Sequence, residues 1–200
     1  MKTIPAFFAI LVLGAQAVFA AVKPGDTAPD FQLTDIHGKT HSLAEFKGKP
    51  VVLEWVNYGC PFVGKQYNSK NMQTLQKEYT AKGVVWLSIN SSAPGKQGNL
   101  SAEEWQKAVA EKGAHPTAVL LDADGKVGHL YGAKTTPDMW VINSEGKVVY
   151  TGAIDSIASV DVADIPKAEN YVKEALDATM AGKPVTTAET RSYGCSVKYE

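Results

Sequence analysis

The sequence predicts an α/β domain in which a core of parallel strands is followed by an antiparallel hairpin. Residues 51–56 and 84–89 are continuous apolar runs, which are typical of central strands buried on both faces. A helical pattern fills residues 61–82 between them, and a strand–helix–strand unit forms a right-handed crossover between parallel strands. Residues 139–142 and 147–150, on either side of a short turn, predict the hairpin.

The elements before this core are short. Residues 26–35 carry Phe31 and Leu33 in alternation with polar residues, which predicts a strand, and a turn at residues 36–39 leads into a second short strand. Within the crossover helix, Pro61 suits the first turn, and an irregularity is expected at Asn68 and Ser69. The predicted inner face of this helix consists of Phe62, Val63, Met72, Leu75 and Tyr79.

The second half of the chain continues the α/β pattern. After a loop at residues 91–99, Ser101 and Glu104 form a capping-box pattern that predicts a helix to about residue 111. We then expect a strand at 117–121, a short helix at 127–131 and a closing amphipathic helix at 167–180. The residues of the closing helix expected to face inward are Tyr171, Ala175, Leu176 and Met180.

Composition and charge exclude several classes of protein. The chain has 200 residues, 44% of them hydrophobic and 20% charged, which is the profile of a globular protein. A formal net charge of −1 leaves no broad basic surface for nucleic acid. Only Arg191 is arginine, so sites that need a planar guanidinium are almost excluded from the main body of the chain.

The amino terminus has the pattern of a signal peptide. A short positive start precedes an apolar run at residues 6–15, and Val18 and Ala20 are suitably small for cleavage before Ala21. The run is shorter than the roughly 20 apolar residues that cross a bilayer, although an uncleaved membrane anchor is the alternative. We therefore expect a signal peptide at 1–20, a domain at 21–181 and a tail at 182–200, in the periplasm or secreted.

Cys60 is the strongest candidate for chemistry. It follows the first buried strand and directly precedes a helix, at the edge of a parallel sheet where ligands collect. Free N–H groups and the dipole at a helix start favour thiolate, and such cysteines often titrate at roughly 3.5 to 7.5. The position therefore predicts a nucleophilic sulfur; the alternative is an inert buried cysteine.

Several segments together resemble the thioredoxin fold. They are residues 51–63 (VVLEWVNYGCPFV), Thr136–Pro137 and Gly146, and residues 25–33 (GDTAPDFQL) resemble the redoxin and peroxiredoxin branch. The resemblance covers about residues 22–180 and implies a three-layer α/β/α sandwich with a mixed central sheet. It also implies that Pro137 is cis and faces the cysteine, and that Thr136, Pro137 and Pro61 form the substrate platform.

The resemblance extends to a buried acid. Glu54 matches the buried carboxyl group of thioredoxins, which implies a proton acceptor six residues before Cys60. Burial would raise the pKa of this carboxyl group. A salt-bridged glutamate at a sheet edge is the alternative.

Two departures from these relatives matter. Val63 stands where thioredoxins have a second cysteine, so local Cys-X-X-Cys chemistry is impossible. The threonine and arginine that assist peroxide cleavage in peroxiredoxins are missing. The second sulfur must come from Cys195, so we hypothesise a reversible Cys60–Cys195 disulfide with Cys60 attacking and Cys195 resolving. A permanent staple, worth roughly 5 kcal/mol for so long a loop, is the alternative.

The resulting expectation is an exported thiol-disulfide oxidoreductase without cofactor. Its partners would be protein or small-molecule disulfides and thiols and an unidentified redox partner, with no nucleic acid and no stable membrane anchor after cleavage. The four histidines are scattered, so no metal site is expected. Two alternatives stay open: a thiol-dependent peroxide reductase, and a noncatalytic thioredoxin-fold binding module with a structural disulfide.

Overall fold

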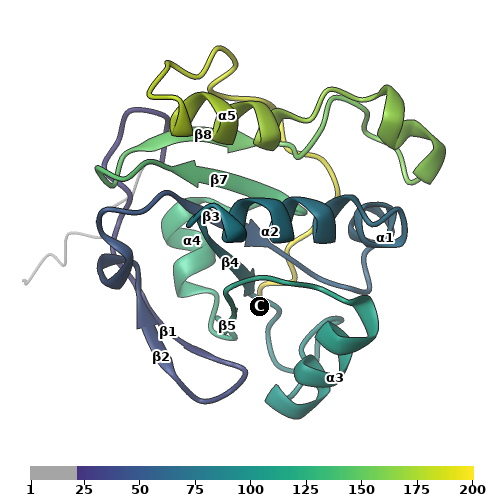
Figure 1. Cartoon of the computed structure of the whole chain (residues 1–200). Helices are drawn as coiled ribbons and strands as arrows, with labels where there is room; N and C mark the ends of the chain where they lie inside the picture. Colours follow the sequence, from purple (N-terminus) through teal and green to yellow (C-terminus); the bar gives the residue numbers. More distant parts are fainter. Residues whose placement is uncertain (1–21) are drawn as a thin grey trace, which may run out of the picture.

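The computed structural model describes residues 22–200, and the predicted signal peptide lies outside the described residues. A seven-stranded sheet in the order β2-β1-β5-β4-β3-β7-β8 crosses the molecule (Figure 1). Strand β6 pairs separately with β9. The strands are β1 Gln32–Asp35, β2 Thr40–Ser42, β3 Val51–Trp55, β4 Val85–Asn90, β5 Ala118–Leu121, β6 Thr135–Thr136, β7 Asp138–Ile142, β8 Val148–Gly152 and β9 Cys195–Ser196.

The centre of the sheet has the predicted mixture of directions. Strands β3, β4 and β5 are parallel neighbours, and β7 pairs with β3 antiparallel before β8 returns beside it. All residues of β3 and β4 are buried, as expected for apolar runs covered on both faces. The α/β prediction and the hairpin are confirmed.

The helices are α1 Pro61–Asn68, α2 Asn71–Ala81, α3 Ala102–Lys112, α4 Lys126–Tyr131 and α5 Tyr171–Met180. The irregularity predicted near Asn68 separates α1 from α2, where Lys70 adopts a φ of 64°. The capping box of Ser101 and Glu104 forms at the start of α3.

The closing helix differs from the prediction. A 3-10 turn, Val162–Lys167, ends at the residue where the helix was expected to begin, and residues 168–170 are not helical. Helix α5 begins only after Asn170, whose side chain accepts a hydrogen bond from the N–H of Lys173. Met180, predicted to face inward, is 42% exposed because it is the last residue of the helix and projects beyond the core.

Successive residues of β3 alternate between two hydrophobic clusters, one on each face of the sheet. Val52 belongs to the cluster that includes residues of α1, α2 and α5. Leu53 belongs to the opposite cluster, which includes Val127 and Tyr131 of α4. The sheet is therefore the middle layer of three, with Cys60 at the edge where β3 ends.

The carboxyl-terminal tail is an ordered part of the fold. It runs beside β8, where Thr151 and Thr190 pair through their backbones, and β9 then places the chain end near β4 and β5 (Figure 1). Val197 is buried and its N–H donates to the carbonyl of Lys134. Among residues 22–200, no helix has the length and apolar character needed to span a membrane.

Candidate active site

A braced turn between β3 and α1 positions Cys60. The Asn57 side chain accepts a hydrogen bond from the N–H of Gly59 at 2.9 Å, and its amide donates to the carbonyl of Gln97 at 3.0 Å. Gln97 in turn donates to the carbonyl of Gly59 at 3.1 Å. The loop after β4 thus fixes the turn, so Cys60 forms the N-cap of α1 with Pro61 at the first helical position.

Five of the predicted site residues lie at or beside this turn. The Cys60 thiol donates to the backbone carbonyl of Thr136 at 3.1 Å, and the Thr136–Pro137 peptide bond is cis. The sulfur atoms of Cys60 and Cys195 lie 2.7 Å apart, and both residues are free thiols. Pro61 is exposed beside them, whereas Pro137 is buried.

The tail itself occupies the backbone edge of the expected substrate platform. Strand β9 pairs antiparallel with β6, with Cys195 opposite Thr136 and Ser196 opposite Thr135. Cys60 is only 1% exposed, whereas Cys195 is partly exposed. A bulky disulfide therefore reaches Cys60 only when the tail moves away from β6.

Gly194 makes the close approach of the tail possible. Its φ is 144°, and a Cβ at this position would lie 2.1 Å from the carbonyl oxygen of Thr136. Any side chain here would collide with the backbone to which β9 pairs, so only glycine permits this register.

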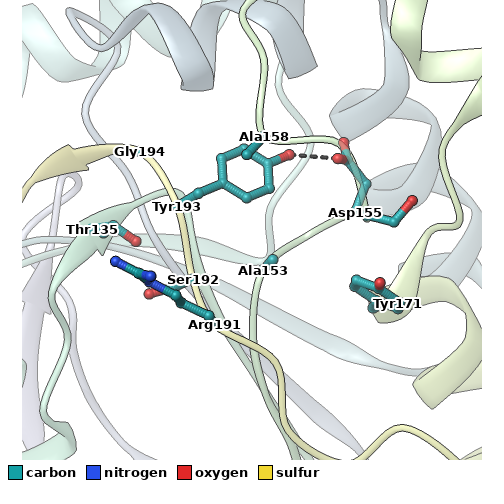
Figure 2. Close-up of a pocket in the computed structure, with 10 residues that line it drawn as sticks. Thr135, Ala153, Asp155, Ala158, Tyr171, Arg191, Ser192, Tyr193 and Gly194 are labelled. Carbon is teal, nitrogen blue, oxygen red and sulfur yellow. Dashed lines mark hydrogen bonds between the residues drawn. The ribbon is translucent and has the colours of Figure 1, made fainter.

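A buried polar cluster, which the sequence did not predict, holds the residue before Gly194. The Tyr193 hydroxyl donates to Asp155 at 2.5 Å across one side of a cavity of about 540 Å³ (Figure 2). Asp155 also accepts from Gln66 at 2.7 Å and lies 3.4 Å from the ammonium group of Lys65. No local pattern around Asp155 marks it as a partner of the tail; the aromatic residue beside Gly194 was the one available signal.

The two thiols have opposite pKa shifts. Burial acts to raise the pKa of Cys60, but hydrogen bonds to its thiolate from the Cys195 thiol and the N–H of Val63 outweigh it, and the pKa lies below the ordinary value. Burial and the neighbouring Cys60 sulfur raise the pKa of Cys195 to about 11. Of the two thiols, Cys60 therefore ionises first as pH rises.

Glu54 lies in the middle of β3 and is completely buried. It has no salt bridge in the described chain, and it accepts hydrogen bonds from four side chains: Tyr67, Gln76, Trp86 and Ser88. Burial raises its pKa, against the effect of these donors. No hydrogen bond joins Glu54 to Cys60 in the described structure, so its role as a proton acceptor stays a prediction.

A second buried acid, Asp138, braces the platform and was not predicted. Its carboxylate accepts from the N–H of Lys134 at 2.9 Å and of Thr135 at 3.4 Å. Burial raises the pKa of Asp138 to about 6 despite these donors. Residues 22–200 contain no group of three or more His, Cys, Asp or Glu side chains placed to hold a metal ion.

Two thiols in contact where a central strand meets a helix define a thioredoxin-like redox protein. Residues 23–172 match the family model named Redoxin, so the chain belongs to the Redoxin family. It is 30% identical over 136 residues to the thiol-disulfide oxidoreductase ResA of Geobacillus thermodenitrificans, a match covering 67% of this chain and 72% of that protein. ResA of Bacillus subtilis is 29% identical, over 66% of this chain and 70% of the relative.

Solved structures confirm the thioredoxin-like fold. A hypothetical protein of Sinorhizobium meliloti superimposes with a TM-score of 0.76 at 28% identity, covering 90% of this chain and 97% of that one. An uncharacterised protein of Geobacillus kaustophilus gives 0.76 at 29% identity, with 94% and 98% covered. A crystal structure assigned as the thiol:disulfide interchange protein DsbE of Chlorobium tepidum gives 0.53 at 29% identity, with 66% and 85% covered.

Proposed function

We propose that the protein exchanges disulfides with external substrates through Cys60 and Cys195. The observation that carries this proposal is the 2.7 Å contact between the two sulfurs, with the thiolate favoured on Cys60. The thiol-disulfide oxidoreductases among its relatives support the same chemistry. The substrate class is disulfides and thiols, of proteins or small molecules.

The reaction has two steps that balance without a cofactor. The Cys60 thiolate attacks one sulfur of a substrate disulfide, forms a mixed disulfide and releases the other sulfur as a thiolate. Cys195 then loses its proton and attacks the Cys60 sulfur, so the substrate leaves as a second thiolate and the Cys60–Cys195 disulfide forms. The substrate gains two electrons and the protein loses two; a redox partner must reverse this change.

The pKa of Cys195 suits the second step. In the reduced protein, the neighbouring Cys60 sulfur contributes to the raised pKa of Cys195, after the larger effect of burial. Once Cys60 has entered a mixed disulfide its negative charge is gone, so Cys195 ionises more easily. The attacking thiol is therefore activated when it is needed.

Disulfide exchange fits this site better than peroxide cleavage. The Thr136 carbonyl, whose oxygen lies 3.1 Å from the Cys60 sulfur, accepts hydrogen bonds and cannot stabilise an oxyanion. Arg191 is exposed and lines the cavity beside Tyr193.

A single-turnover experiment tests the proposal. Reduced protein is mixed with oxidised glutathione, quenched in acid and analysed by mass spectrometry. Wild type should end as the internal disulfide, Cys195→Ser should stop at a glutathione adduct on Cys60, and Cys60→Ser should react far more slowly at neutral pH. Equal rates for wild type and Cys60→Ser would refute the assignment of the nucleophile.

The same proposal includes export. Its support is the pattern of residues 1–20 and the pairing of two cysteines, which suits an oxidising compartment. Fractionation of the producing cell, with amino-terminal sequencing of the mature protein, tests both the compartment and the cleavage before Ala21.

A further inference from the structure

The attacking sulfur of this protein is covered by its own tail. Cys60 is 1% exposed, and Cys195 lies directly against it on β9. Only two residue pairs join β9 to β6, which is a short ladder for holding a strand. We therefore looked for contacts outside this ladder that hold the tail against β6 and Cys60.

The cluster around Asp155 provides such an anchor. Asp155 is 3% exposed and Lys65 is completely buried in their ion pair, and Lys65 also donates to the carbonyl of Ile157 at 2.7 Å. A buried carboxylate with these partners is fixed in place, since moving it would leave Lys65 as an unpaired buried charge. Lys65 belongs to α1, the helix that Cys60 caps, so this anchor is rigidly connected to the nucleophile.

Tyr193 connects the tail to this anchor. Its hydroxyl donates to Asp155 at 2.5 Å (Figure 2). Its ring packs edge-on against Phe62 with the ring centres 5.8 Å apart. Tyr193 precedes Cys195 by two residues and holds the tail on that side of Cys195; on the other side, the N–H of Val197 donates to the carbonyl of Lys134 and the Tyr199 hydroxyl donates to the carbonyl of Ala133. The contact of Tyr193 with Asp155 lies on the far side of Gly194 from the β6–β9 ladder.

We infer that Tyr193 and Asp155 form a latch that holds the tail over Cys60 and sets the access of external disulfides to it. The inference rests on the proposed role of Cys60 as the attacking sulfur. When the latch opens, the tail leaves β6 and Cys60 meets the substrate; when it closes, Cys195 returns to resolve the mixed disulfide. Tyr193 and Asp155 are positioning residues that act through Cys195.

The latch predicts a gain in reactivity when it is weakened. If Cys60 reacts only while the tail is released, its rate is proportional to the population of the released state. A hydrogen bond to a charged group stabilises by enough to change such a population about tenfold or more. Tyr193→Phe keeps the ring against Phe62 and removes only this bond, so Cys60 should react about tenfold faster or more.

The experiment measures alkylation of Cys60 in the Cys195→Ser protein, where one thiol remains. The alkylation rate of each variant is measured at a pH high enough that Cys60 is fully ionised. The rates then compare how accessible the Cys60 sulfur is, not how much of it is thiolate. Tyr171→Phe is the matched control, because Tyr171 lines the same cavity and its hydroxyl has no hydrogen bond within residues 22–200. Phe46→Leu, which truncates a buried ring that stacks on His41, controls for global destabilisation.

The inference requires faster alkylation in Tyr193→Phe and an unchanged rate in Tyr171→Phe. An unchanged rate in Tyr193→Phe would overturn it. An equal acceleration in Phe46→Leu or Tyr171→Phe would also overturn it, because exposure of Cys60 would then follow general loosening of the fold. Alkylation needs no substrate disulfide, so these results are independent of whether the protein exchanges disulfides; inactivity toward glutathione would instead refute the proposed function.

Discussion

The dependence of the Cys60 pKa on its neighbour gives the sharpest test of the site. Cys195→Ala removes the thiol that lies 2.7 Å from the Cys60 sulfur, whereas Cys195→Ser keeps a hydroxyl donor there. Each variant retains one cysteine, so the coupled titration of the wild-type pair is avoided. The two variants differ by little more than one hydrogen bond to the Cys60 thiolate.

The expected magnitude follows from that bond. A hydrogen bond to a charged group stabilises it by about 1.5 to 3 kcal/mol, and one pKa unit corresponds to about 1.4 kcal/mol. The pKa of Cys60 should therefore be about one to two units higher in Cys195→Ala than in Cys195→Ser. Below that pKa, the thiolate fraction would fall about tenfold to a hundredfold.

The ultraviolet absorbance of the thiolate measures this pKa directly, without needing reagent access to the buried sulfur. Cys60→Ser provides the baseline for tyrosine absorbance. Equal pKa values in Cys195→Ala and Cys195→Ser would refute the claim that Cys195 stabilises the Cys60 thiolate. The low pKa would then have to come from the helix terminus alone.

Two further predictions concern the platform and the tail. Gly194→Ala should displace β9 and weaken the Cys60–Cys195 disulfide, because the new Cβ would lie 2.1 Å from the carbonyl oxygen of Thr136. Gly182→Ala is the control, since Gly182 also has a positive φ but has nothing within 4 Å of its Cβ position. A redox titration with dithiothreitol compares the stability of the disulfide in the two variants. For Asp138, a folded pKa of about 6 against an ordinary 3.8 means that the native state binds the extra proton. Stability should therefore fall by about 3 kcal/mol in total as pH rises from about 3 to 7, through both pKa values. Urea unfolding of wild type and Asp138→Asn across this range measures it, and a difference that does not change with pH contradicts the raised pKa.

The sequence alone determined most of the sheet and the position of the candidate nucleophile. The apolar runs of β3 and β4, the capping box of α3 and the junction at Cys60 are local patterns, and local physics is enough to interpret them. The break between α1 and α2 was also predictable from its neighbouring polar residues. The resemblance supplied the cis bond before Pro137, which composition alone does not indicate.

The tertiary structure decided what surrounds that nucleophile. The two sulfurs are 135 positions apart, and their contact depends on the register of β9 on β6, which no local pattern encodes. The ion pair of Lys65 and Asp155 joins positions 90 apart for the same reason. Periodicity shows which face of an element is buried, but which polar groups meet inside depends on packing between distant segments. The sequence therefore identified the candidate nucleophile, and the fold determined which residues cover it and shift its pKa.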